Sequence, residues 1–130
     1  MSLSDPIADL LTRIRNAASA KHRHVDARAT KLLINLVKVM QKLGFVEKFL
    51  IKEEERKMRI FLKYAEGRES LITGLKRVSR PGLRRYVGHT EIPRIDGGMG
   101  LVVLSTSKGV LDGESAREQG VGGELLCFIW

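Results

Sequence analysis

An apolar run in the last third of the chain breaks abruptly into polar residues, and this break limits what the segment can form. Residues 101–104 read Leu-Val-Val-Leu, and residues 105–109 read Ser-Thr-Ser-Lys-Gly. Four consecutive apolar residues, two of them β-branched, favour a strand that is buried on both faces. The hydroxyls, the lysine and the turn-permitting glycine place many polar groups in a small volume. We therefore expect a buried strand that ends in a polar surface loop, either a simple hydrogen-bonded turn or a loop that fits a narrow polar groove.

The charge balance favours a polyanionic partner. The 130 residues include 23 Lys and Arg against 15 Asp and Glu, which gives a formal net charge of +8. A surplus of this kind is typical of proteins that bind nucleic acid. The length suits one compact domain or two small lobes that share an interface.

Cysteine usage and hydropathy exclude several classes of protein. Cys127 is the only cysteine and lies in the closing apolar run, so it predicts a buried thiol and leaves no disulfide framework or cysteine zinc site. Charged residues, among them Asp5, Asp9, Arg13 and Arg15, interrupt the N-terminal segment. This pattern argues against a secretory leader and against a membrane span. We expect a soluble protein of the reducing cytoplasm.

Two amphipathic helices are predicted in the N-terminal half. Asp5 before Pro6 marks the start of the first helix. Thr30 marks the start of the second, which we expect to end before Gly44 in the C′ position. The predicted apolar faces of the two helices are Ile7, Leu10, Leu11 and Ile14, and Leu33, Leu36, Val37 and Met40.

Three strands complete an N-terminal lobe that we expect to span residues 1–66. Residues 21–28 are basic and weakly periodic, which predicts a short edge strand or a loop. Residues 45–51 and 58–64 predict two strands joined by a highly charged, solvated turn. The resulting order is helix, strand, helix and hairpin.

Residues 67–130 predict a second, mainly β lobe with one short helix. Glycine becomes frequent after the polar segment 66–70, and long helical periodicity disappears. Asp112 and Gly120 predict the N-cap and the C′ residue of the short helix. The fold class that we expect is α/β, more closely α+β, in two small lobes. The strands predicted in this lobe are residues 75–78, 83–87, 101–104 and 125–130.

Basic residues surround a tyrosine in the second lobe. Tyr86 lies in segment 76–94, whose only acid is Glu91, and residues 79–82 (Ser-Arg-Pro-Gly) predict a tight turn just before it. An aromatic ring among cations can stack on an unpaired base, and it can equally pack on a neighbouring sheet. The sequence leaves both alternatives open. The basic residues are Lys76, Arg77, Arg80, Arg84, Arg85 and Arg94.

Enzyme-like spacings occur without the rest of their motifs. Ser105 and Lys108 have the Ser-x-x-Lys spacing of serine acyl enzymes, but the accompanying elements are absent. His22 and His24 alternate as two metal ligands would, without a third ligand at a suitable spacing. The glycines of residues 120–123 do not follow the phosphate-loop pattern and instead indicate the close approach of two backbones, or of a backbone and a ligand. We expect no catalytic residue, no metal and no cofactor; a small hydrolase stays as a rival.

Four segments, in this order, carry a resemblance to a known family. They are residues 5–16 (Asp-Pro-Ile-Ala-Asp-Leu-Leu-Thr-Arg-Ile-Arg-Asn), 77–82 (Arg-Val-Ser-Arg-Pro-Gly), 105–109 and 120–124 (Gly-Val-Gly-Gly-Glu). Over nearly its whole length the sequence closely resembles the bacterial form of small-subunit ribosomal protein eight. The resemblance implies two α/β lobes, no catalysis, and primary binding to a helical segment in the central domain of small-subunit ribosomal RNA, which helps to assemble the platform.

The resemblance also implies which residues contact the RNA. Residues 105–108 would form the recognition loop against a shallow minor-groove face, with Tyr86 near an unstacked base. Residues 122–124 match a second contact, and Lys31 matches a smaller contact from the first lobe. The basic residues of the second lobe would meet phosphates. The implied RNA-binding residues are Lys31, Arg84, Arg85, Tyr86, Ser105, Thr106, Ser107, Lys108, Gly122, Gly123 and Glu124.

The partners follow from the same resemblance. They are small-subunit ribosomal RNA, neighbouring small-subunit ribosomal proteins and, in some members of the family, the protein's own messenger RNA, with no membrane partner. The expected location is the ribosome in the cytoplasm. Residues 87–90 are less basic than is usual in the family, which bears on the peripheral phosphate contacts. A general single-strand RNA-binding module is the leading rival to this interpretation.

Overall fold

The first helix begins where the sequence predicts. The structure is a computed structural model that describes residues 4–130. Helix α1 spans Pro6–Ser19, and the carboxylate of Asp5 accepts a hydrogen bond from the backbone N–H of Ala8 at 3.2 Å. This bond satisfies one of the free amides at the start of the helix. The predicted apolar face, Ile7, Leu10, Leu11 and Ile14, is buried.

The second helix and the edge strand before it also match the prediction. Strand β1 spans His24–Arg28, and helix α2 spans Lys31–Lys42. The hydroxyl of Thr30 accepts a hydrogen bond from the backbone N–H of Leu33 at 3.3 Å. Gly44 follows the helix with φ at +87°, a conformation that glycine adopts without steric cost.

A three-stranded antiparallel sheet covers the two helices. Strands β2 (Val46–Lys52) and β3 (Lys57–Leu62) form the predicted hairpin, and the strand order is β1-β3-β2. Met58, Ile60 and Leu62 alternate on the buried face of β3. The predicted β3 extended to residue 64, but the strand ends at Leu62. Single 3₁₀ turns lie at Glu53–Glu55, Glu66–Arg68, His89–Glu91 and Asp96–Gly98.

The second lobe is a five-stranded sheet with one short helix. The order is β4-β8-β6-β7, and β5 pairs with the other part of β8. Helix α3 spans Gly113–Gln119, with Asp112 as its N-cap and Gly120 after it at φ +67°. Strand β7 was not predicted, and β5 is shorter than the predicted strand 83–87. The strands are β4 (Leu75–Arg77), β5 (Tyr86–Val87), β6 (Leu101–Thr106), β7 (Gly109–Asp112) and β8 (Gly123–Ile129).

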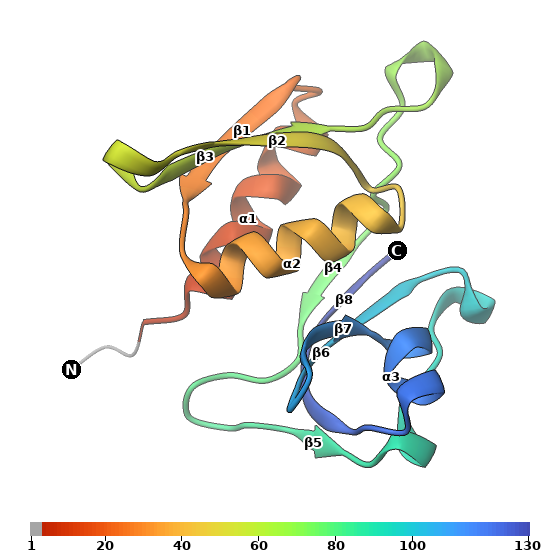
Figure 1. Ribbon diagram of the computed structural model, residues 1–130. Helices are drawn as coiled ribbons and strands as arrows, with labels where there is room; N and C mark the ends of the chain where they lie inside the picture. The colour runs from red at the N-terminus through yellow and green to blue at the C-terminus, as the bar shows by residue number, and fades with distance from the viewer. Residues whose placement is uncertain (1–3) are drawn as a thin grey trace.

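One hydrophobic core joins the two lobes. Helices α1 and α2 lie between the two sheets (Figure 1), and residues of β6 and β8 pack into the same buried cluster as the helix faces. Cys127 belongs to this cluster, and burial raises the pKa of its thiol to about 12. A second, smaller cluster lies beneath α3. The predicted α+β fold of two lobes is confirmed, whereas the division at residues 66 and 67 stays a prediction.

Candidate nucleic-acid interface

Three of the predicted site residues lie in one row across the second sheet. Strand β8 runs between β5 and β6, so that Tyr86 pairs with Glu124, and Glu124 pairs with Ser105. Directly paired residues of neighbouring strands project to the same face of a sheet. The sheet therefore brings together, on one face, side chains that lie far apart in the sequence.

Two glycines set how closely these strands approach. A Cβ atom on Gly122 would lie 2.2 Å from the carbonyl oxygen of Val87, and one on Gly123 would lie 2.1 Å from that of Ser105. Both distances are well below van der Waals contact, so any side chain here would force the strands apart. Of the two alternatives for these glycines, the structure shows a close approach of backbones. Their contribution is to position the residues on either side of β8.

The polar segment after the buried strand forms a tight hairpin. Strand β6 continues through Thr106, which pairs with Gly109, and Ser107 and Lys108 form the exposed turn. The hydroxyl of Thr106 donates to the carbonyl of Gly109 at 2.8 Å and accepts from the N–H of Lys108 at 3.1 Å. The loop expected directly after residue 104 is therefore corrected, because pairing with β7 and β8 keeps the backbone extended for two more residues. Thr106 stabilises the turn, which leaves Ser107 and Lys108 pointing into solvent.

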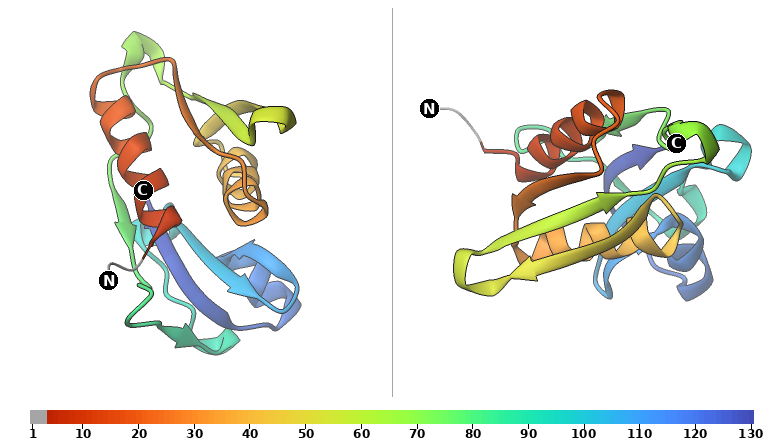
Figure 2. Two further views of the ribbon diagram at one scale, coloured as in Figure 1. Left: turned by 90° about the vertical axis from the view of Figure 1, so that its left-hand side faces the viewer. Right: turned by 90° about the horizontal axis from the view of Figure 1, so that it is seen from above.

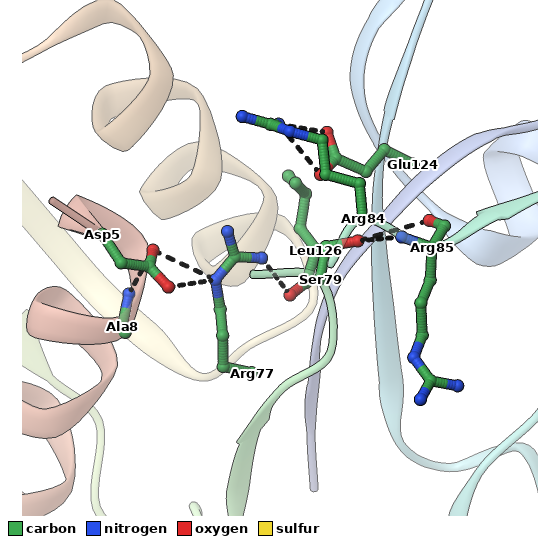
Figure 3. Close-up of polar contacts among 8 residues, drawn as sticks. All are labelled: Asp5, Ala8, Arg77, Ser79, Arg84, Arg85, Glu124 and Leu126. Atoms are coloured by element: carbon green, nitrogen blue, oxygen red, sulfur yellow. Dashed lines mark hydrogen bonds and ion pairs between the residues drawn. The ribbon is translucent and has the colours of Figure 1, made fainter. Parts of the chain in front are cut away.

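A buried serine that sequence reasoning missed holds the segment before Tyr86. The side chain of Ser79 is fully buried; its hydroxyl accepts from the N–H of Arg85 at 2.9 Å and donates to the carbonyl of Arg85 at 3.3 Å (Figure 3). The predicted turn lies one residue later, where Arg80 and Leu83 exchange backbone hydrogen bonds. Tyr86 itself is 67% exposed, which argues against packing of its ring on a neighbouring sheet, whereas stacking on a base stays a prediction.

The two arginines before Tyr86 behave differently. Arg84 forms an ion pair with Glu124 at 3.2 Å, and its side chain is 53% exposed whereas that of Glu124 is 12% exposed. Figure 3 shows the side chain of Arg85 pointing away from this pair. Arg85 is thus directed away from Arg84, and Glu124 already has a cationic partner in the protein.

A small hollow connects this row to the first lobe. Its volume is about 160 Å³, and Ser105, Arg84 and Glu124 line it together with residues at the starts of both helices, including Asp5 and Leu32. Lys31 is the exposed first residue of α2 and directly precedes Leu32. Lys31, the predicted site residue of the first lobe, therefore lies next to a residue that lines this hollow.

The described residues also bear on the metal-like and enzyme-like spacings found in the sequence. Within residues 4–130, no three His, Cys, Asp or Glu side chains lie close enough to hold a metal ion. No hydrogen bond in this part of the chain joins Ser105 to Lys108. A hollow of about 980 Å³ lies elsewhere, at one end of the N-terminal sheet. The same described range contains no helix long and apolar enough to cross a membrane.

The fold and these exposed groups together give the class of the protein: a two-lobed α+β protein with a basic, hydroxyl-bearing surface, which suits a polyanion. Comparison with known sequences then gives the family. A sequence profile described as Ribosomal protein S8 matches residues 5–130. The chain is 53% identical, over 133 residues and the full length of both chains, to the small ribosomal subunit protein uS8 of Protochlamydia amoebophila (strain UWE25).

Two further relatives agree with this assignment. Identity to the uS8 protein of Chlamydia felis (strain Fe/C-56) is 54% over 129 residues, which cover 98% of this chain and 97% of the relative. Identity to the uS8 protein of Natranaerobius thermophilus is 48% over 132 residues and the full length of both chains. The chain belongs to the ribosomal protein S8 family, a family of structural, non-enzymatic proteins, and this confirms the resemblance found in the sequence.

Proposed function

We propose that this chain, a structural constituent of the small ribosomal subunit, binds ribosomal RNA through the face of the second sheet that carries Tyr86, Glu124 and Ser105. The relatives carry the name of a small-subunit protein over their whole length, and this chain matches them end to end. A component of the bacterial ribosome works in the cytoplasm. The RNA segment that we propose is a helical region of the central domain, whose binding helps to assemble the platform.

The row formed by Tyr86, Glu124 and Ser105 is the observation that carries this proposal. An exposed ring offers a stacking platform, and hydroxyls beside it can bond base edges and 2′-hydroxyls in a wide, shallow RNA minor groove. Both features stand on paired strands rather than on a free loop, so little conformational entropy is lost when RNA binds. This arrangement supports recognition of an irregular helix with an unstacked base more than it supports binding to any single strand.

We assign the contacts by the chemistry of each exposed group. The hydroxyl of Ser107 reads base edges or sugar hydroxyls, and the ammonium of Lys108 meets a phosphate. Arg85, whose side chain is free of the Glu124 pair, meets the backbone on its own side of the strand. The full proposed set is Lys31, Arg84, Arg85, Tyr86, Ser105, Thr106, Ser107, Lys108, Gly122, Gly123 and Glu124, in which Thr106 and the glycines shape the surface.

Neighbouring small-subunit proteins are proposed as further partners, and so is a hairpin in the protein's own messenger RNA. A messenger hairpin would need the same hydroxyl turn, because the described surface shows one such turn beside one exposed ring. Binding of the messenger and of ribosomal RNA would then be mutually exclusive.

A filter-binding titration of Ser107→Ala tests the proposed function. The RNAs are the central-domain hairpin and a scrambled hairpin of equal length, each at two salt concentrations. We expect the wild type to prefer the specific hairpin at both, because salt weakens the phosphate contacts that the two RNAs share. Loss of the Ser107 hydroxyl should cost about 1–3 kcal/mol with the specific RNA only.

Ser19→Ala is the matched control, since it removes an exposed hydroxyl at the end of α1. It should leave both affinities unchanged. Equal binding of the wild type to the two hairpins would contradict specific recognition and leave only a general basic RNA-binding module.

A further inference from the structure

Helix α2 carries a polar stripe along one side. Lys31, Asn35, Lys38 and Lys42 follow one another at intervals of four, three and four residues. Residues at these intervals lie above one another on one face of an α-helix. The three lysines of the stripe are exposed, and Asn35 is half-buried.

The stripe forms one wall of a groove between the lobes. Asn35, Lys38 and Lys42 line a groove of about 320 Å³ whose opposite wall is Lys108 and strand β7. Figure 1 shows α2 passing beside β7. Lys108 is also the exposed turn residue of the β6–β7 hairpin, so the groove begins at the hairpin that the proposed RNA site uses.

An ion pair closes one end of the groove, and the positive charges along the rest of the groove have no acidic partner among the described residues. The ammonium of Lys42 lies 3.5 Å from the buried carboxylate of Asp112 and donates to the hydroxyl of Ser115 at 3.2 Å. By contrast, Lys38 and Lys108 take part in no ion pair or hydrogen bond through their side chains within residues 4–130. Asp112 therefore compensates the charge of Lys42, whereas the charges of Lys38 and Lys108 have no such partner within residues 4–130.

We propose that this groove binds the phosphate backbone of the RNA strand that leaves the segment recognised by the β6–β7 hairpin. The inference rests on the proposed function and extends it to a second contact. An ammonium is a compact point charge that holds a phosphate without reading sequence. Lys108 contributes to both the hairpin and the groove, so a strand in contact with the turn would pass directly between α2 and β7. This continuity favours RNA over an acidic segment of a neighbouring protein.

The test compares salt dependence on two RNAs with the full-length protein. One RNA is the minimal specific hairpin, and the other is the same hairpin extended at its base by a turn of duplex. For Lys38→Gln we expect the slope of log K against log salt to fall by about 1 on the extended RNA and to stay unchanged on the minimal one. Lys38→Arg keeps the charge and should restore the slope.

Lys63→Gln is the matched control, because Lys63 is exposed, follows β3 and is absent from the groove walls. It should leave both slopes unchanged. An unchanged slope for Lys38→Gln on the extended RNA would overturn the groove, and so would an equal fall on both RNAs, which would place Lys38 in the primary contact. Failure of the proposed function looks different, because the wild type would then bind specific and scrambled hairpins equally.

Discussion

At the scale of single residues, the candidate site depends on side chains whose positions are fixed by others. Tyr86 is exposed because Ser79 and β8 hold the backbone of residues 85–87, which leaves the ring no neighbouring sheet face to cover. Leaving a large apolar ring in water gains nothing for the fold. The exposed ring beside hydroxyls and cations is therefore free to contact a partner, as the proposed function requires.

Removal of the ring should weaken RNA binding without unfolding the protein. For Tyr86→Ala we expect a loss of about 1–3 kcal/mol in affinity for the specific hairpin, the usual contribution of one stacked base. Tyr86→Phe keeps the ring and should retain most of the affinity. The measurement is the same filter-binding titration, with thermal unfolding as the check on the fold. If the two variants lost affinity equally, the phenolic hydroxyl rather than stacking would be responsible.

At the scale of elements, Asp112 joins β7, α3 and α2. Its carboxylate accepts the N–H of Ser115 at 3.2 Å and the hydroxyl of Ser115 at 2.7 Å, and it pairs with Lys42. Burial alone would raise the pKa of this carboxyl, but the bonds from Ser115 and the charge of Lys42 outweigh burial and hold the pKa below its usual value. The charged form is therefore the one that the fold stabilises.

The stability contributed by Asp112 should disappear in acid. Because its pKa is lower in the folded than in the unfolded protein, the contribution is complete above the unfolded value, about 3.9, and is lost as pH falls through the folded value. Asp112→Asn keeps a capping oxygen but does not titrate. Urea unfolding at neutral and acidic pH should show a larger acid loss for the wild type than for this variant. Parallel losses would show that the Asp112 charge is not stabilising.

Elements with local signals could be predicted from the sequence, and elements that depend on distant pairing could not. The caps at Asp5 and Thr30 are local, and α1 and α2 begin where they indicate. Strand β7 has four residues and begins at a glycine, so only its pairing with β6 defines it. The role of Ser79 depends on a contact formed across a turn, which a single hydroxyl in a sequence does not reveal.

The candidate site divides in the same way. The hairpin at residues 105–108 could be singled out because polar groups follow a buried strand without a break. That Arg84 pairs with Glu124 while Arg85 points away could not be predicted. Both arginines have the same charge, and their directions depend on how the segment before β5 lies against β8. The groove between α2 and β7 could not be predicted either, because its walls come from both lobes.

At the scale of the whole molecule, the two lobes are joined by polar contacts as well as by the shared core. The views in Figure 2 show α1 lying close to β4 of the second sheet, which agrees with a hydrogen bond from Arg15 to the carbonyl of Leu75 at 2.6 Å. Arg77 of β4 pairs with Asp5 and donates to the carbonyl of Leu126 at 2.6 Å (Figure 3). Asp5 therefore caps α1 and anchors it to the second lobe at the same time.

Two ion pairs of equal length, one at the start of α1 and one within it, allow this link to be tested. Arg77 and Asp5 lie 3.1 Å apart with side chains 15% and 18% exposed, whereas Arg13 and Asp9 lie 3.1 Å apart with side chains 54% and 68% exposed. Arg77→Ala leaves the largely buried Asp5 carboxylate without its cationic partner and removes one of the two donors to the carbonyl of Leu126, so we expect a loss of about 2–4 kcal/mol in the free energy of unfolding. Arg13→Ala should cost less than about 1 kcal/mol, because water screens an exposed pair.

Urea unfolding, followed by the fluorescence of Trp130 and by far-ultraviolet circular dichroism, measures the free energy of unfolding of both variants. It also tests whether the two lobes unfold together. Trp130 lies at the end of β8 and α1 lies in the other lobe, so coincident transitions in Arg77→Ala would show that the shared core keeps the lobes cooperative without the ion pair. Separate transitions would show that cooperative unfolding of the two lobes depends on Arg77. Equal losses for the two alanine variants would contradict a structural role for the Arg77 pair, because burial is the main difference between them.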